Sequence, residues 1–242
     1  MVNDNYPSGN IAGKLLYNSL YHDGAFDGYF RRQYALVGRI HSIIPKNSQK
    51  PFAMLVNSDD KCVGYLVDQI KGETLGAYLE AGVIRDAIEV SARTLQVSKI
   101  EDLLSESDLY SVLARKKPSY LARVSEKLKE YSAASKMYGE RADMLALVGD
   151  KLDEIADSLK SKDIYHNNIS KENIVINVDD SVIPTVYLVN PMNSEDAGYA
   201  GVARTDNKDA SDIAAVRALL EKKIKRERAL AKKYSNRFDR LI

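Results

Sequence analysis

The sequence predicts an α+β fold in which a small lobe of strands and one helix precedes a larger, mainly helical lobe. Short apolar runs separated by polar turn residues dominate the first 80 residues. Helical three-four periodicity with mixed charge dominates residues 83–160, and β-like runs return after residue 172. This order does not fit a doubly wound sheet, in which strands alternate with helices along the whole chain.

The front lobe is predicted to hold three strands and one helix. Ile11–Tyr17 is the first predicted strand, and Phe52–Val56 and Cys62–Val67 are two more, joined by a polar turn at 57–61. Apolar side chains recur at helical spacing over Phe26–Ile44. This spacing predicts one amphipathic helix between the first strand and the hairpin.

The back lobe is predicted to begin with four helices. Each shows apolar residues at three-four spacing, and Pro118 and Gly139 are typical of the breaks between helices. The predicted helices are Ile84–Leu95, Ile100–Ala114, Tyr120–Met137 and Arg141–Leu159.

Two strands and a final helical segment follow. Asn173–Val178 and Thr185–Val189 are predicted strands around a polar turn, and residues 193–207 are rich in turn-forming residues, which predicts a loop. The rest of the chain is predicted to form one or two helices. Asp209 and Ser211 are the candidates for the cap at their beginning.

Composition excludes several classes of protein. The 242 residues carry 35 basic and 34 acidic side chains, and this net charge of +1 by itself favours neither a nucleic-acid binder nor a membrane-surface protein. Cys62 is the only cysteine, so no intrachain disulfide forms, which favours a reducing compartment. The three scattered histidines give no zinc spacing, and no run of about 18 apolar residues is present to span a membrane. We therefore expect a cytoplasmic protein, and the sequence leaves open an effector translocated by a specialised bacterial system.

The most informative segment is 163–176, DIYHNNISKENIVI, in which polar residues of varied chemistry precede a predicted strand. It resembles the catalytic loop of the protein-kinase-like family, H-R-D-x-x-x-x-N followed by a short strand. His166 matches the histidine of that motif, and Asn173 matches its metal-binding asparagine. Asn168 stands where the family has its catalytic aspartate.

Segments of the front lobe fall into the same order. The run IAGK resembles the strand that carries the family's phosphate-binding lysine, which implies that role for Lys14. Gln33 lies nineteen residues later on the predicted helix, where the resemblance implies the glutamate partner of that lysine. The backbone near Asp68, Gln69 and Ile70 is implied to face an adenine.

Segments of the back lobe complete the resemblance. In YLVNPM, Asn190 occupies the place of the D-F-G aspartate. The run SDIAAVRALLEKKI resembles the buried helix whose first aspartate braces the catalytic loop, which implies a structural role for Asp212, and His166 is the second expected structural residue.

The resemblance implies a bilobal protein-kinase-like fold, with a truncated N-lobe sheet plus one helix and a mainly helical C-lobe that lacks the late helices. The implied N-lobe covers residues 1–70. The implied C-lobe covers residues 71–224 and includes a helical insertion at about 83–137. A basic C-terminal helix or tail is expected at 225–242.

Three carboxylates that this family uses are amides in this chain: Gln33, Asn168 and Asn190. An amide keeps the shape of a carboxylate without its charge, so Asn168 cannot act as a general base and Asn190 is no anionic magnesium ligand. A glycine-rich phosphate loop has no room before Lys14. The sequence therefore predicts no active catalytic residue, no metal site and no cofactor. Any ATP binding, through Lys14, Asn173 and the 68–70 backbone, is expected to be weak and independent of magnesium.

These departures favour a pseudokinase that binds or regulates a protein partner through the helices of 83–137, without ordinary phosphotransfer. One alternative is a nucleotide-dependent transferase of altered chemistry that uses the kinase-like cleft. A second alternative is binding of nucleic acid or anionic lipid through Lys222–Arg240, where nine cations are opposed only by Glu227 and Asp239.

Overall fold

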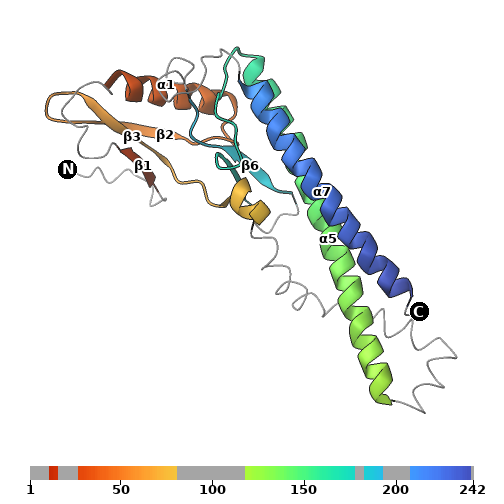
Figure 1. Cartoon of the computed structure of the whole chain (residues 1–242). Helices are drawn as coiled ribbons and strands as arrows, with labels where there is room; N and C mark the ends of the chain where they lie inside the picture. The colour runs from red at the N-terminus through yellow and green to blue at the C-terminus, as the bar shows by residue number, and fades with distance from the viewer. Residues whose placement is uncertain (1–10, 16–26, 81–117, 178–182, 193–207, 241–242) are drawn as a thin grey trace. The chain divides into compact units, whose positions relative to one another are not determined.

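The computed structural model describes residues 11–15, 27–80, 118–177, 183–192 and 208–240, and these form an α+β fold (Figure 1). The chain divides into two compact units. The first unit comprises Met1–Ala77 with Leu147–Ala218, and the second comprises Tyr78–Ala146 with Leu219–Ile242. Two long helices, α5 and α7, contribute to both units.

A three-stranded antiparallel sheet and one helix open the first unit. The strands are β1 (Ile11–Leu15), β2 (Pro51–Val56) and β3 (Cys62–Asp68), in the order β1-β3-β2. Helix α1 (Asp27–Ile43) lies between β1 and β2 in the chain.

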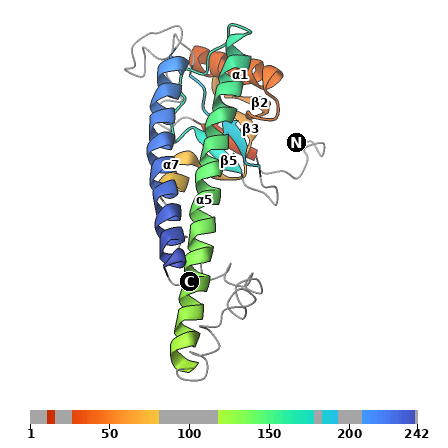
Figure 2. The same ribbon diagram turned by 90° about the vertical axis from the view of Figure 1, so that its right-hand side faces the viewer.

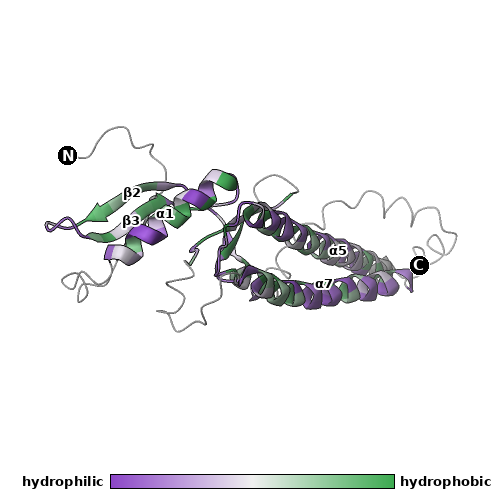
Figure 3. Cartoon of the chain, turned by 90° about the horizontal axis from the view of Figure 1, so that it is seen from above, coloured by the Kyte–Doolittle hydropathy of each residue, from purple (hydrophilic) through white to green (hydrophobic). Residues whose placement is uncertain are grey.

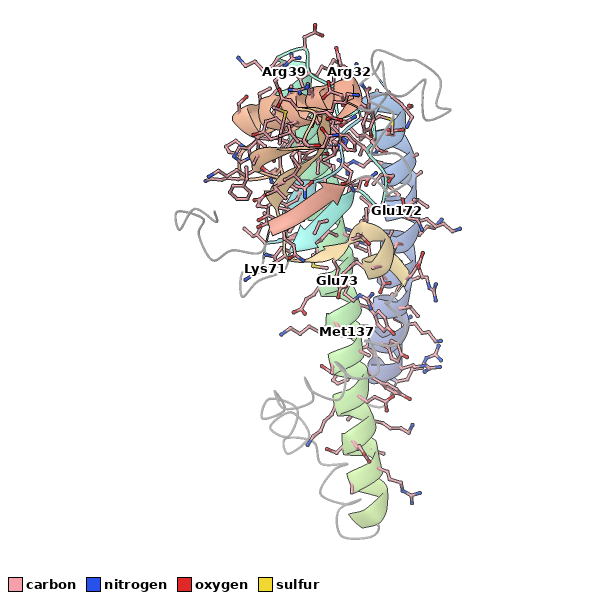
Figure 4. The ribbon with its side chains drawn as sticks, turned by 90° about the vertical axis from the view of Figure 1, so that its left-hand side faces the viewer. Arg32, Arg39, Lys71, Glu73, Met137 and Glu172 are labelled. Atoms are coloured by element: carbon pink, nitrogen blue, oxygen red, sulfur yellow. The ribbon has the colours of Figure 1, made fainter. Side chains whose placement is uncertain are left out.

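The core of this part lies between α1 and β3. On the α1 side, the Phe30 and Tyr34 rings each lie 6.2 Å from the Tyr65 ring of β3, measured between centroids. Val67 is completely buried in the same cluster. Arg32 and Arg39 are exposed on the outer side of α1 (Figure 4), so this helix has the amphipathic pattern that its sequence predicts.

A second small sheet also belongs to the first unit. It consists of β4 (Glu73–Thr74), β5 (Ile174–Asn177) and β6 (Thr185–Leu188), all antiparallel and in that order. The loop after α1 is bonded to β6, because Asn47 accepts a hydrogen bond from the Leu188 N–H at 2.9 Å and donates from its side chain to the Val186 carbonyl at 2.8 Å.

Gly72 leads the chain into β4 in a conformation that few other residues adopt. Its φ is 136°, and a Cβ atom at this position would lie 2.4 Å from the Ile176 carbonyl oxygen. Only glycine therefore allows the backbone to approach β5 this closely.

Helix α5 (Pro118–Lys160) is continuous over 43 residues, so the predicted break at Gly139 is wrong. A Cβ atom at Gly139 would meet nothing within 4 Å, and Met137 and Ala142 on either side are buried. Glycine in a helix interior costs about 1 kcal/mol relative to alanine. The free energy gained by burying the neighbouring side chains exceeds this cost, so the helix continues.

Helix α7 (Asp209–Asp239) runs antiparallel to α5 and beside it (Figures 2 and 3). In the first unit, the Arg217 guanidinium bonds Asp153 and lies 3.2 Å from an Asp150 oxygen. In the second unit, the Ser135 hydroxyl donates to the Ala231 carbonyl at 3.0 Å. The end of the chain is thus a single helix through residue 239, and the expected boundary at 225 falls inside it.

Most other predicted elements are confirmed within one to three residues, namely the strands at 11, 52, 62, 173 and 185 and the helix at 26–44. The predicted helices at 84–95 and 100–114 and the predicted loop at 193–207 lie outside the described residues. In the described ranges, no helix has an apolar stretch long enough to cross a bilayer. The bilobal arrangement with boundaries at 70 and 224 stays a prediction.

Candidate functional site

The loop between α5 and β5, residues 163–173, is held by the first turn of α7. The carboxylate of Asp209 accepts hydrogen bonds from the backbone N–H groups of His166, at 2.7 Å, and of Asn167, at 2.6 Å. Asp212, one turn later, accepts from the Ile169 N–H at 3.1 Å. Acidic residues are favoured at a helix N-terminus, so the same two carboxylates also suit the helix that carries them.

Asp209 is 6% exposed, and burial raises the pKa of its carboxyl, while the bonds from His166 and Asn167 oppose that shift. Sequence reasoning gave the bracing role to Asp212 alone and treated Asp209 as a helix cap. The structure shows that Asp209 makes two of the three bonds from α7 carboxylates to the loop backbone and Asp212 makes one. Two aspartates three residues apart in the first turn were the available signal.

The loop and the segment after β6 both contain residues in left-handed backbone conformations. Asp163 and Asn167 of the loop have φ values of 53° and 54°, and Asn190 after β6 has a φ of 56°. Asparagine and aspartate adopt this region more readily than other non-glycine residues. The side chain of Asn167 also accepts a hydrogen bond from the Lys208 N–H at 3.1 Å, which adds a further bond between the loop and the start of α7.

The side chain of His166, a residue of this loop, is completely buried. Its carbonyl accepts a hydrogen bond from the Met192 N–H at 2.8 Å. Burial lowers the pKa of its imidazole to about 3, and the backbone of Val189 opposes that shift. Neither ring nitrogen reaches full hydrogen-bond geometry with any described group, Val189 included. At neutral pH the ring is therefore uncharged and packs the loop against the segment that follows β6.

The structure brings together three predicted site residues, Asn168, Asn173 and Asn190, in a closed ring of hydrogen bonds, which we call the amide triad. Asn168 donates from its side chain to the Asn190 carbonyl at 2.7 Å. Asn190 donates from its side chain to the Asn173 side-chain oxygen at 2.9 Å. Asn173 donates in turn to the Asn168 carbonyl at 3.2 Å and to the Ser170 hydroxyl at 3.2 Å.

The pairing of β5 with β6 explains why the amide triad forms. Ile174 pairs with Leu188 in the sheet, and one step further along the Val189 N–H donates to the Asn173 carbonyl at 2.9 Å. Because the strands are antiparallel, Asn173, which precedes β5, and the residues that follow β6 are forced to be neighbours. Asn190 then needs only its left-handed turn to direct its side chain at Asn173.

The amide triad consists of neutral groups. The Asn173 side-chain oxygen, the atom that the resemblance assigns to a metal, already accepts the Asn190 amide. The adjacent carboxylate, Glu172, has a largely exposed side chain that lies 3.5 Å from the Lys171 ammonium (Figure 4). Within the described ranges, no group of three or more His, Cys, Asp or Glu side chains is placed to hold a metal ion.

Of the residues predicted for the phosphate end of a nucleotide, Gln33 is described in full and Lys14 in part. Gln33 lies on α1 and is 2% exposed. The backbone of Lys14 pairs with Tyr65 in the sheet, and Tyr65 contacts the α1 rings on both sides of Gln33 in the sequence. The side chain of Lys14 lies outside the described part, so its contact with Gln33 stays a prediction.

Hydrogen bonds within the protein involve the Asp68 backbone at the end of β3, and the expected contact of this backbone with an adenine stays a prediction. The Asp68 N–H donates to the Lys50 carbonyl at 3.0 Å, and the Asp68 carbonyl accepts from the Gln49 side chain at 3.3 Å. The Asp68 carboxylate also bonds the Lys50 N–H. Gln69 is exposed and Ile70 is partly buried; a contact of these two residues with adenine stays a prediction.

Comparisons with known proteins add no identity to this site: no family model, no curated protein and no solved structure matches the chain.

Proposed function

We propose that this chain is a pseudokinase, a protein-kinase-like fold that binds or regulates a protein partner without ordinary phosphotransfer. The amide triad is the observation that carries the proposal. In the catalytic loop that the segment 163–176 resembles, an aspartate serves as base and an asparagine and a second aspartate hold magnesium. Here those three positions are adjacent and bonded to one another through amides.

The bond from Asn190 to Asn173 takes the place that a metal ion would need. A magnesium ion requires several hard oxygen ligands with negative charge among them. The Asn190 amide N–H₂ donates instead to the Asn173 oxygen, the atom that the resemblance assigns to the metal. Without the metal, the charge on a transferring phosphoryl group is not neutralised, so the chemistry stops.

The loop is nevertheless kept in a defined conformation. Asp209 and Asp212 accept hydrogen bonds from its backbone, and the side chain of its residue His166 is completely buried. A loop held in one conformation without catalytic carboxylates is compatible with a binding module, because a preorganised fold lowers the cost of binding. The proposed partner surface is the helical segment 83–137, of which residues 83–117 lie outside the described part. The buried thiol of Cys62 agrees with the proposed cytoplasmic location.

Phosphotransfer and nucleotide binding test the proposal directly. Purified protein is expected to transfer no labelled phosphate from ATP to itself or to a generic protein substrate. Its melting temperature is expected to change little with ATP, and by the same amount with and without magnesium. Magnesium-dependent incorporation that disappears in Lys14→Ala would overturn the proposal and would favour a nucleotide-dependent transferase.

Restoring the lost charges tests whether the amide triad is a former metal site. The double variant Asn168→Asp with Asn190→Asp is expected to bind Mn²⁺, because two carboxylates then flank the Asn173 oxygen. The matched control is Asn57→Asp, since the Asn57 side-chain oxygen only accepts hydrogen bonds, from Asp59 and Lys61 at 3.0 Å each. If the double variant binds no more Mn²⁺ than this control, the kinase-like interpretation of the loop is wrong.

A further inference from the structure

The second half of α7 carries a line of positive charge along one side. Lys222, Lys225 and Arg226 begin a series whose members lie three, four or seven residues apart, the spacings that keep side chains on one side of a helix. All of its members are exposed. We call the series the basic stripe, and it consists of Lys222, Lys225, Arg226, Lys232, Lys233, Arg237 and Arg240.

The other side of this half of α7 is occupied by packing within the second unit. Leu220 is 1% exposed and Glu227 is 2% exposed. Tyr234 lies against two tyrosines of α5, with ring centroids 5.7 Å from Tyr138 and 6.0 Å from Tyr131. The apolar side of the helix is thus already covered, and the exposed basic stripe is the side left to solvent. Figure 3 shows that hydrophilic residues are frequent along α7.

Among the residues that the structure describes, no carboxylate neutralises the charge of the basic stripe. Within the described ranges, none of its members forms an ion pair; the nearby ion pairs use Lys223 with Glu227 at 3.3 Å and Arg228 with Asp143 at 3.6 Å. Arg237 lies over the Tyr131 and Tyr234 rings instead, with its guanidinium carbon 5.8 Å from each centroid. This stacking limits the freedom of the Arg237 side chain and leaves its charge available.

The last turns of the stripe border a hollow of about 370 Å³. Its described lining contains four cations and one amide and no carboxylate: Ala229, Lys232, Lys233, Asn236, Arg237 and Arg240. Ammonium and guanidinium groups with an amide are the donors that bind phosphate oxygens.

The arrangement of the charges selects among phosphate-bearing partners. The stripe extends over 19 residues, a rise of about 27 Å along an α-helix, so it matches a linear series of phosphates rather than one isolated group. A membrane-surface helix needs a free apolar side to enter the lipid, and in α7 that side is covered. Single-strand binders need exposed aromatic rings for base stacking, and the stripe contains none.

We propose that the basic stripe binds the backbone of double-stranded nucleic acid without regard to sequence. This site is independent of the amide triad and lies in the other compact unit. Each cation that neutralises a phosphate releases a counterion, so affinity is expected to fall steeply with salt.

The test measures binding of the full chain to a labelled 20-base-pair duplex of arbitrary sequence, as DNA and as RNA, over a series of salt concentrations. The stripe variant is Lys232→Gln with Lys233→Gln and Arg240→Gln, which leaves the stacked Arg237 in place. If each replaced cation contacts one phosphate, the slope of log K against log salt becomes shallower by about 3, and affinity at low salt falls at least tenfold.

The matched control replaces three lysines outside the stripe, Lys136→Gln with Lys151→Gln and Lys162→Gln, and it is expected to bind like the natural chain. Thermal unfolding confirms that both triple variants fold. The proposal is overturned if the natural chain binds no duplex, or if the control loses as much affinity as the stripe variant. It is also overturned if the chain prefers the single strand, or if it binds vesicles with 30% anionic lipid while ignoring the duplex.

Discussion

The two ends of α7 carry charge of opposite sign in opposite surroundings. At the first turn, Asp209 and Asp212 face the protein, and Asp209 is almost completely buried against the loop that it binds. Toward the last turns, the cations of the basic stripe face water, and none forms an ion pair within the described ranges. Both signs suit the helix dipole, so the dipole does not explain the difference in burial.

Burial and bonding explain what each end is for. A charge that leaves water has to be compensated by hydrogen bonds, so the buried end is committed to holding the loop in place. A charge left in water adds little to stability and remains available to a partner. Helix α7 therefore has one end that is structural and one end that is suited to binding. Substitutions at the two ends are expected to differ in their effect on stability.

The largest effect is expected at the buried end. Replacing Asp209 with alanine leaves two buried N–H groups, of His166 and Asn167, without their acceptor, and the expected loss of unfolding free energy is about 4 kcal/mol. Chemical denaturation measures it. Asp239→Ala at the exposed end is the matched control and is expected to change stability by less than about 0.5 kcal/mol. Equal losses in the two variants would contradict the separation of the two ends.

The next largest effect is expected at Gly72 in the first unit, where the structure has no space for a Cβ atom. Gly72→Ala places a Cβ atom 2.4 Å from the Ile176 carbonyl oxygen at a φ of 136°, so we expect a loss of about 3 kcal/mol. The melting temperature and the denaturant midpoint report this change. A variant as stable as the natural chain would show that the approach of residue 72 to β5 is wrong.

A smaller effect is expected from pH, through His166. The buried ring has a pKa of about 3, below the value of about 6.5 expected in the unfolded chain, so the unfolded state takes up the proton first. The contribution of His166 to stability is full above pH 6.5 and is lost as the pH falls toward 3. Each pH unit in this window costs about 1.4 kcal/mol, or about 2 kcal/mol between pH 6.5 and pH 5.

Denaturation of the natural chain and of His166→Gln at several pH values isolates that contribution. The difference in unfolding free energy between the two proteins should stay constant above pH 7 and shrink as the pH falls below 6.5. A difference that stays constant down to pH 5 would mean that the ring is not buried in its neutral form.

The smallest effect is expected in the second unit, and its sign is opposite. Gly139 lies inside α5, and a Cβ atom there meets nothing within 4 Å. Gly139→Ala should therefore raise the unfolding free energy by about 0.7 kcal/mol, because alanine loses less conformational freedom in a helix. A loss of stability would indicate that α5 bends or ends near residue 139.

Local patterns predict the strands and α1 because period and turn residues act within a few positions. The break predicted at Gly139 was wrong for the same reason, since a local preference of about 1 kcal/mol is smaller than the burial of neighbouring side chains such as Met137. The sequence did not predict that Asp209 holds the 163–173 loop, because Asp209 and Asp212 both lie in the first turn of α7 and either could take this role. Which of them binds His166 and Asn167 depends on how the loop meets the helix.

The amide triad was predictable in its members but not in its bonds. The motif order singled out Asn168, Asn173 and Asn190. The bond between the side chains of Asn190 and Asn173 depends on the register of β5 against β6 and on the left-handed turn at Asn190. Neither feature has a sequence signal strong enough to be read without the structure.

The most direct test of the central claim asks whether a metal ion reaches the amide triad. Mn²⁺ is added to the ¹⁵N-labelled natural chain in the presence of ATP, and the side-chain amide signals of Asn168, Asn173 and Asn190 are recorded by NMR. If the bond from Asn190 to Asn173 closes the metal position, all three signals keep their intensity in the natural chain at Mn²⁺ concentrations that broaden the Asn173 signal in the variant Asn168→Asp with Asn190→Asp. Asn173 is the probe that both proteins share. Selective broadening of the three signals in the natural chain would contradict the account and show that the site still binds a metal.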